Sequence, residues 1–594
     1  MLTPIASQPR KGWLSKSILA CTGAFGLMLS AAQAQQINTV FYVLLENRCL
    51  SSGTDKSQTN VLYGNPAAPF FNALMTPGNP LAVNSSWCSA YHNANSQTTG
   101  DFVSQTGSKT DGTGAGGAIH PSEPNYVFME AGSNLSKYDD NDPYGSGNSV
   151  AQIAKFLSLN PNVSGENFCA LLQNAGITWK AYQEGTNLQN TTGGNFNTAG
   201  GTLTNNVVPA GQRTVPLASF SGTSASYTNP INGSHQFNFA AKHCGSLFFP
   251  ATSGSTVTAA NTSTSNVEVS HYAPLEDLDT DLANGTVAAY NVITPDQFND
   301  GHTALSSAFV YTPTVANGNI GTGQSYAGGS DINRVALMDN CCAVLVNKIV
   351  NSAWYSAASP SGGTNGSHTA IVLWTDETEG SPNDDYYHTL LEIVISPLCK
   401  GNAYNSTLNF THSSDVATFQ KVFGVTANTP TGYLNDAANA SQVTVGTATV
   451  NNGQGLVPAT GQPFQGFGTG TATDLSDLFQ PAVIPASIPG LNLAASGFSY
   501  NRKTNVYSQT VTVTNALSTA IANPVYLVVG SLANTTLNNK TGTTVNNFPG
   551  NPYISVSPSG LAAGASATVT LQFAAPSSGG ISDTMSAINT AAQP

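Results

Sequence analysis

One nearly unbroken apolar stretch, Ile37-Asn38-Thr39-Val40-Phe41-Tyr42-Val43-Leu44-Leu45, runs directly into Glu46-Asn47-Arg48. Its β-branched and aromatic residues are typical of a strand buried on both faces of a largely parallel sheet. In open α/β sheets the ligand site lies at the carboxyl ends of the strands. Glu46 and Asn47 are therefore candidate oxygen ligands for a cation, although the same two residues alone fit the start of an ordinary polar loop equally well.

A second stretch repeats this arrangement of a strand followed by acids. Ala370-Ile371-Val372-Leu373-Trp374 leads through Thr375 into Asp376 and Glu377. Adjacent carboxylates at a strand end repel each other unless a cation neutralises them. Two such strand ends, side by side in one sheet, can form a site for a hard cation that prefers oxygen ligands.

A candidate nucleophile stands in the segment His120-Pro121-Ser122-Glu123-Pro124-Asn125-Tyr126. Pro124 is tolerated in the first turn of a helix, which makes Ser122 a candidate N-cap. An anionic group such as a phosphate also settles at the positive end of a helix, so a serine there could attack phosphorus. This segment alone favours a serine that only caps its helix.

Two histidines are candidates for acid catalysis. His243 follows Lys242 and precedes a pair of phenylalanines, and His302 comes after the strand-like run from Val287 to Thr294. A histidine among aromatic residues is more often part of the core than an acid, and by itself His243 favours the core. His302 would lie at the carboxyl end of a strand, where ligands bind.

The N-terminus has the features of a signal peptide. Arg10, Lys11 and Lys16 precede an apolar run from Ile18 to Leu29, and Ala32-Gln33-Ala34 offers a cleavage site. We expect residues 1–34 to be removed and the protein to be secreted or periplasmic. The apolar run is too short to span a bilayer, and the sequence has no later stretch long and apolar enough to do so.

Charge is scarce in this sequence. Only 8% of the 594 residues are charged and the net charge is −13. This balance argues against nonspecific nucleic-acid binding and against electrostatic docking on anionic lipid. A hydrophilic but uncharged surface fits an exported protein, and the sequence indicates no protein partner.

Cysteine usage gives a further expectation. Seven cysteines follow the signal peptide: Cys49, Cys88, Cys169, Cys244, Cys341, Cys342 and Cys399. An oxidising compartment favours disulfides among them, with one thiol left over. The sequence contains no CxxC motif, so a structural zinc site is not expected.

The length predicts two or three folding units. We expect an α/β unit over 35–487 and a small all-β sandwich over 488–594, where short alternating strands are separated by turn residues. Further elements are expected as helices at Ser149–Leu157, Cys169–Asn174, Asp331–Val350 and Val416–Phe423, and as strands at Ile177–Tyr182, Leu391–Ser396, Val506–Thr514, Pro524–Val529, Tyr553–Val556 and Ala567–Phe573.

Taken in order, several segments resemble the bacterial phosphoesterase family of phospholipases C and acid phosphatases, a branch of the alkaline phosphatase superfamily. The matching segments are Val43 to Arg48, His120 to Tyr126 with Gly132-Ser133, Lys242-His243, Pro295-Asp296 with Asp300-Gly301-His302, Trp374 with Asp376-Glu377, and Thr411-His412-Ser413. The resemblance implies a mixed, mainly parallel sheet with helices on both faces. The predicted C-terminal sandwich lies outside the match and resembles Ig-like appendages of some exported bacterial enzymes.

The resemblance also implies roles for single residues. Glu46, Asn47, Asp376 and Glu377 would bind a divalent metal ion, with Ca²⁺, Mg²⁺ or Mn²⁺ favoured over Zn²⁺ because all ligands are oxygens. Ser122 would be the nucleophile, and His243 and His302 would face the phosphate. We therefore expect a metal-dependent hydrolase of phosphate esters, of acid phosphatase or phospholipase C type, that forms a phosphoserine and works best at mildly acidic pH.

Two other classes of function stay open at this point. The chain could be a noncatalytic surface or binding protein on the same scaffold. It could also be a hydrolase in which Ser122 attacks a carbonyl carbon, although the sequence has no G-x-S-x-G motif around that serine and the paired acids have no task in acyl transfer.

Overall fold

The computed structural model describes part of the chain in enough detail to assign structure. The described residues are 36–51, 61–92, 122–132, 140, 143, 167–186, 188–190, 203–207, 219–225, 227–253, 267–311, 323–378, 389–408, 410–427, 433–434, 442–445, 448–451, 474–481, 483–484, 491–515, 520–521, 524–544, 550–576 and 580–589. The expected signal peptide and the expected helix at Ser149–Leu157 lie outside these residues. Among them, no helix is both long and apolar enough to cross a bilayer.

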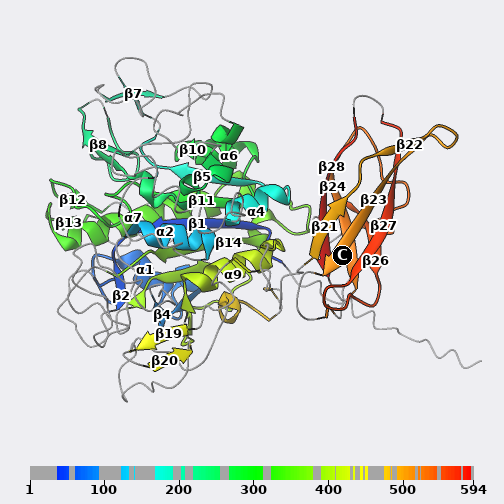
Figure 1. Ribbon diagram of the computed structural model, residues 1–594. Helices are drawn as coiled ribbons and strands as arrows, with labels where there is room; N and C mark the ends of the chain where they lie inside the picture. The colour runs from blue at the N-terminus through cyan, green and yellow to red at the C-terminus, as the bar shows by residue number, and fades with distance from the viewer. Residues whose placement is uncertain are drawn as a thin grey trace, which may run out of the picture. The chain divides into compact units, whose positions relative to one another are not determined.

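A mixed sheet of eight strands, which come from residues 39–406, lies among the helices of that stretch (Figure 1). Its strands in spatial order are β10 (Tyr272–Pro274), β5 (Trp179–Gln183), β11 (Tyr290–Thr294), β1 (Thr39–Leu45), β14 (Thr369–Thr375), β16 (Glu392–Ile395), β3 (Ser85–Cys88) and β17 (Tyr404–Ser406). The first five strands are parallel, β16 is antiparallel to both neighbours, and β3 and β17 are parallel. The expected mixed, mainly parallel sheet is confirmed.

Both faces of this sheet are covered, as the alternation along β1 shows. Val40, Tyr42 and Leu44 join a hydrophobic cluster that includes residues of α2, α4 and α9. The intervening Phe41, Val43 and Leu45 join a second cluster with residues of α1, α6 and α7. The helices are α1 (Pro69–Leu74), α2 (Ser122–Ala131), α4 (Phe168–Asn174), α6 (Asp277–Asn284), α7 (Asp331–Val350) and α9 (His412–Phe423). Because successive strand residues point to opposite faces, a continuous apolar strand needs two such layers.

Local signals set the ends of the two longest of these helices. The Ser330 side chain accepts a hydrogen bond from the backbone N–H of Asn333 and so caps α7, which has the predicted bounds. Thr411 and Ser414 form a capping box at the start of α9, and Gly424 ends it in the left-handed conformation. The predicted helix from Val416 therefore begins four residues earlier, at His412.

Shorter elements surround the central layers. Within the described ranges, the remaining helices are α5 (Pro250–Ser253) and α8 (Ala353–Ser356), with 3₁₀ turns at Pro80–Ala82, Ala241–His243, Gly245–Phe248, Val267–His271, Asn365–His368 and Leu475–Leu478. Strands outside the large sheet are β2 (Cys49–Ser51), β4 (Tyr91–His92), β6 (Leu188–Asn190), β7 (Leu203–Val207), β8 (Phe220–Thr223), β9 (Gln236–Phe239), β12 (Phe309–Val310), β13 (Ser325–Tyr326), β15 (Thr389–Leu390), β18 (Phe410–Thr411), β19 (Gln442–Val445) and β20 (Ala448–Asn451).

The C-terminal strands form two antiparallel sheets. One contains β21 (Leu491–Ala495), β22 (Ser499–Asn501), β23 (Val506–Asn515) and β27 (Ser566–Ala574), and the other contains β24 (Val525–Ala533), β25 (Gly542–Thr543), β26 (Pro552–Ser557) and β28 (Ser582–Asn589). Residues of both sheets, among them Val511, Phe573, Leu527 and Ile554, share one hydrophobic cluster. The four strands expected here are present, while the boundary at 487/488 stays a prediction.

The expectation of disulfides is wrong for this structure. All seven cysteines after residue 34 are buried, and no disulfide joins any two of them. Cys341 and Cys342 belong to the hydrophobic cluster on one face of the sheet, whereas Cys88, Cys169, Cys244 and Cys399 belong to the cluster on the other. The sheet therefore separates Cys341 and Cys342 from those four cysteines, and the thiols act as small apolar side chains of the core.

Some acidic side chains are buried away from any cation. Glu130 of α2 contacts Cys169, whose backbone N–H and thiol lie 3.3 and 3.2 Å from the two carboxylate oxygens. Burial raises the pKa of Glu130 from 4.5 to about 7, while the two contacts with Cys169 lower it less. Such a carboxyl binds its proton more tightly in the folded chain than in the unfolded one, so it destabilises the fold as pH rises from about 4.5 through 7.

Glu130→Gln should therefore stabilise the protein at pH 8 relative to the parent and change little at pH 4. The expected gain at pH 8 is about 3 kcal/mol, from a pKa difference near 2.5 units at about 1.36 kcal/mol each. Urea unfolding of both proteins at the two pH values measures it. Equal stability of the variant and the parent at pH 8 would contradict the raised pKa.

Candidate active site

The site is built at the carboxyl ends of two neighbouring strands. β1 and β14 are parallel and in register, with Leu45 opposite Thr375. Glu46 and the pair Asp376-Glu377 consequently emerge at the same edge of the sheet. The backbone N–H of Asp376 donates to the carbonyl oxygen of Leu45 at 3.1 Å, so the pairing of the strands continues into the site.

Three acidic side chains meet at this edge. Carboxylate oxygens of Glu46, Asp376 and Glu377 lie within 4.8 Å of one another, and all three residues are buried. Burial raises the pKa of Asp376 well above its ordinary value, and repulsion by Glu46 and Glu377 raises it further. Among the described residues, Asp376 Oδ2 has no hydrogen-bond partner. This set of oxygens suits a hard divalent cation, which would neutralise the repulsion.

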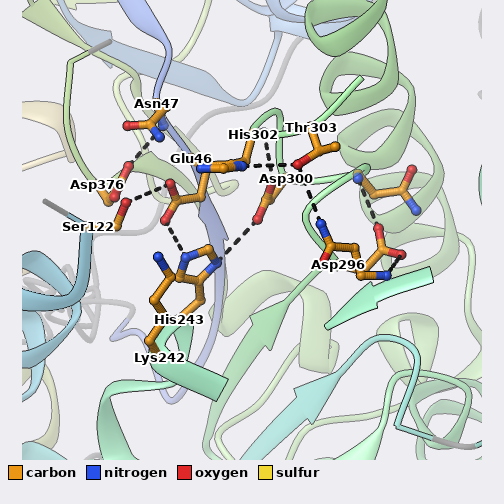
Figure 2. Close-up of polar contacts among 12 residues, drawn as sticks. Glu46, Asn47, Ser122, Lys242, His243, Asp296, Asp300, His302, Thr303 and Asp376 are labelled. Atoms are coloured by element: carbon orange, nitrogen blue, oxygen red, sulfur yellow. Dashed lines mark hydrogen bonds and ion pairs between the residues drawn. The ribbon is translucent and has the colours of Figure 1, made fainter. Parts of the chain in front are cut away.

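Asn47 contacts this cluster through its backbone. Its φ of +47° lies in the left-handed region, which asparagine adopts more readily than most residues. This turn directs the backbone N–H of Asn47 to Asp376 Oδ1 at 3.0 Å, and Figure 2 shows the two residues next to each other. The structure thus brings Asn47 to the acidic cluster, while ligation by its side-chain oxygen stays a prediction.

Ser122 begins α2 and points to the same carboxylates. Its Oγ lies 2.9 Å from Glu46 Oε2 and 3.0 Å from Glu377 Oε1 (Figure 2 draws the contact with Glu46). A neutral hydroxyl has one proton, so it can donate to only one of these oxygens at a time. The second carboxylate oxygen then faces an oxygen lone pair, an arrangement that favours a cation between these oxygens.

Asn125 lies one helical turn after Ser122 and supports Glu377. Its Nδ2 donates to Glu377 Oε2 at 3.2 Å. Residues three apart lie on the same face of a helix, so α2 directs both side chains to the acidic cluster. The predictions from the sequence did not include Asn125, although its spacing from Ser122 is a signal that could have identified it.

His243 lies between two carboxylates on the other side of Glu46. Its Nε2 is 3.0 Å from Glu46 Oε1, and its Nδ1 is 3.4 Å from Asp300 Oδ2. Burial lowers the pKa of His243, but Glu46 and Asp300 outweigh this effect and raise the pKa to about 9. The same ion pair outweighs burial at Glu46 and holds the pKa of that carboxyl well below its ordinary range. The ring also stacks on Tyr126, with centroids 4.9 Å apart.

His302 lies near His243 but makes different contacts. The centroids of the two rings are 6.4 Å apart. His302 Nδ1 is 3.0 Å from the hydroxyl oxygen of Thr303, and the backbone N–H of His302 donates to Asp300 Oδ1 at 2.8 Å. The structure therefore brings His302 to the edge of the site, where its side chain is half-buried.

Two hydrogen bonds join the loop after β11 to the residues that follow β1. The backbone N–H of Glu46 donates to the carbonyl oxygen of Asp300 at 2.9 Å, and Arg48 Nε donates to that of Gly301 at 3.0 Å. Gly301 has a φ of +102°, and a Cβ there would lie 3.2 Å from the Glu46 carbonyl oxygen. Only glycine fits this turn without strain, and the turn places Asp300 against His243.

Lys242 adds a second positive charge beside His243, as Figure 2 shows. Its ammonium group forms an ion pair with Asp140, and only 13% of its side chain is exposed. Burial lowers the pKa of Lys242, but Asp140 and Glu46 outweigh it and raise the pKa above its ordinary value. The site therefore combines three carboxylates on one side with an imidazolium and an ammonium on the other, which suits an anionic group with several oxygens.

The structure brings together most residues that the sequence singled out. Glu46, Ser122, Glu377 and His243 are in direct contact, and Asp376 lies within the same cluster. Asp300 and Lys242 were part of the quoted motifs without an assigned role, because their partners lie in distant segments that the sequence does not connect.

Comparison with known families gives one match, over part of the chain. Residues 115–315 match the family model described as the Phosphoesterase family, which confirms the resemblance over that part of the chain. The match contains Ser122, His243 and His302. The acidic cluster comes from segments before and after it, and only the fold joins them to the matched part. No curated protein matches the chain significantly.

Proposed function

Because residues 115–315 match the Phosphoesterase family, we propose that this chain is an exported, metal-dependent phosphoesterase in which Ser122 forms a phosphoserine. The match itself supports a hydrolase of phosphate esters. The proposal adds the acid phosphatase or phospholipase C type, secretion or export to the periplasm, and an alkaline phosphatase-like arrangement of the sheet.

One observation carries this proposal, which is the position of Ser122. Its hydroxyl lies within hydrogen-bond distance of both Glu46 and Glu377, at the first residue of a ten-residue helix. A serine that only capped its helix would direct its oxygen to backbone N–H groups of the next turn. Here the oxygen contacts an acidic cluster instead, where loss of its proton becomes favourable once a cation is bound.

The acidic cluster fits a divalent cation by the chemistry of its oxygens. Glu46, Asp376 and Glu377 would hold the ion, and Asn47 is the proposed fourth ligand. When bound, such an ion neutralises the carboxylates and lowers the pKa of an adjacent hydroxyl. All-oxygen ligation favours Ca²⁺, Mg²⁺ or Mn²⁺ over Zn²⁺.

The chain's own groups then account for two displacements at phosphorus. Ser122 loses its proton to a carboxylate that it contacts, and Oγ forms a bond to phosphorus while the bond to the leaving oxygen breaks. His243 gives a proton to that oxygen. In the second step water attacks phosphorus, His243 takes the proton of the water, and the bond from phosphorus to Oγ breaks while Oγ takes back its proton from the carboxylate. Lys242 and His302 would hold phosphoryl oxygens throughout.

Ser122→Ala should lower kcat/KM for p-nitrophenyl phosphate by at least ~10³-fold, because it removes the hydroxyl that lies within hydrogen-bond distance of two carboxylates of the acidic cluster. The matched control is Ser89→Ala, which removes a buried hydroxyl that donates to the carbonyl oxygen of Ser406. The control should keep its activity. Comparable rates for Ser122→Ala and the parent would refute Ser122 as the nucleophile.

Removal of metal should abolish hydrolysis reversibly. We expect exhaustive chelation to reduce turnover to background, and Ca²⁺, Mg²⁺ or Mn²⁺ to restore it better than Zn²⁺. Asp376→Asn should require a higher metal concentration for half-maximal activity, since it removes a negative charge from the cluster. Rates measured against metal concentration for both proteins test this, and full activity after chelation would exclude a metal-dependent mechanism.

The pH profile should decline on its alkaline side. A general acid works only while protonated, and His243 has a pKa of about 9 beside two carboxylates. A cation bound to Glu46 would weaken the stabilisation of the imidazolium, so kcat/KM should fall at or below about pH 9. His243→Gln should remove this decline together with most of the activity. A profile of the parent that keeps rising above pH 9 would argue against His243 as the acid.

A further inference from the structure

His412 stands directly behind the acidic cluster, and the proposed reaction assigns it no task. It is the first residue of α9, it is fully buried, and its Nε2 lies 2.6 Å from the backbone carbonyl oxygen of Asp376. That carbonyl belongs to the peptide bond that joins Asp376 to Glu377. A hydrogen bond there acts on the orientation of both acidic side chains at once.

The surroundings of the ring determine which nitrogen carries the proton. A carbonyl oxygen can only accept, so Nε2 must carry a hydrogen. On the other side, Nδ1 faces the indole N–H of Trp374 at 3.2 Å, and that group can only donate. Nδ1 therefore has no hydrogen, and His412 is a neutral ring with one tautomer that directs its single N–H at the Asp376 carbonyl.

Other contacts hold the ring in this orientation. The Tyr91 hydroxyl lies 3.2 Å from Nδ1, accepts from the Trp374 indole N–H at 3.0 Å, and donates to the buried carboxyl group of Asp415. The Trp374 ring lies against the imidazole at 4.8 Å between centroids. Trp374 is the next-to-last residue of β14, so this support comes from the strand that carries the acidic pair.

Resting on the proposed function, we propose that His412 is a positioning residue of the metal site: its Nε2–H holds the Asp376–Glu377 peptide so that both carboxylates face the cation. Two other hydrogen bonds fix Asp376: its backbone N–H donates to the Leu45 carbonyl oxygen, and its Oδ1 accepts from the backbone N–H of Asn47. The hydrogen bond from His412 is the third. A positioning role predicts weaker metal binding when His412 is lost and a nearly normal rate once metal saturates the site.

A second buried histidine, next to the start of β14, provides a matched control. His368 immediately precedes β14, is buried, and contacts two carbonyl oxygens, those of Gln36 and Gly362, at 2.9 and 2.7 Å. It lies eight residues before Asp376, at the opposite end of a strand that runs Thr369–Thr375. Loss of His368 removes a comparable buried ring next to β14 without touching the acidic cluster.

The experiment measures the dissociation constant of Mn²⁺ and of Ca²⁺ by titration calorimetry on the metal-stripped full chain. We expect His412→Ala to raise it ~10- to 100-fold, as is typical when an outer partner of a ligand is lost. His412→Gln, which keeps an N–H donor at nearly the same reach, should recover part of the affinity. His368→Ala should stay within about twofold of the parent even if both alanine variants lose similar thermal stability.

The inference is overturned if His412→Ala binds metal as tightly as the parent, or if His368→Ala loses as much affinity. It is also overturned if kcat of His412→Ala at saturating metal falls as far as that of Ser122→Ala. Should His412→Ala fail to fold, His412→Phe against His368→Phe gives the same comparison, because phenylalanine keeps a ring and has no N–H donor. Failure of the metal-dependent function itself would appear separately, as a parent protein that binds neither ion.

Discussion

The central constraint on this structure is the close approach of three acidic side chains at the ends of two adjacent strands. Glu46, Asp376 and Glu377 are buried within 4.8 Å of one another, and their mutual repulsion opposes folding. Burial of the hydrophobic layers on both faces of the eight-stranded sheet stabilises the fold and offsets this repulsion. His243 offsets part of the charge at Glu46, whereas the charges of Glu46 and Glu377 still raise the pKa of Asp376, so negative charge stays in excess at that carboxyl. This imbalance is the feature that a divalent cation would correct.

Strand pairing and backbone hydrogen bonds fix the positions of the residues in the site. Register between β1 and β14 aligns Glu46 with Asp376. The left-handed turn at Asn47 then brings an N–H group to Asp376, and the turn at Gly301 brings Asp300 behind His243. The two strands and the two turns therefore set the backbone positions from which these side chains meet. Pre-organised charges of this kind need little rearrangement during a reaction.

Much of the fold could be predicted because its signals are local. Buried strands have continuous apolar sequences, and acids directly after them must lie at the carboxyl edge of the sheet; Glu46 and Asp376 were found in this way. The helix at Asp331–Val350 was predicted with its observed bounds from apolar spacing alone. By contrast, the contacts of Asp300, Asn125 and His412 depend on which distant segments meet. The disulfide expectation failed for the same reason, since it used the compartment expected from the N-terminal sequence and not the positions of the thiols.

The distribution of charge around Ser122 also distinguishes attack on phosphorus from attack on a carbonyl carbon. Acyl transfer develops one negative oxygen, for which two N–H donors suffice, and its serine needs a neutral base beside it. Here the Ser122 hydroxyl instead contacts two carboxylates, which would repel a developing oxyanion unless a cation lies between them. A phosphoryl group has three non-bridging oxygens and needs positive charge on several sides. His243, Lys242 and a cation at the acidic cluster would supply that charge from different directions, so the arrangement favours phosphorus over carbon as the atom attacked.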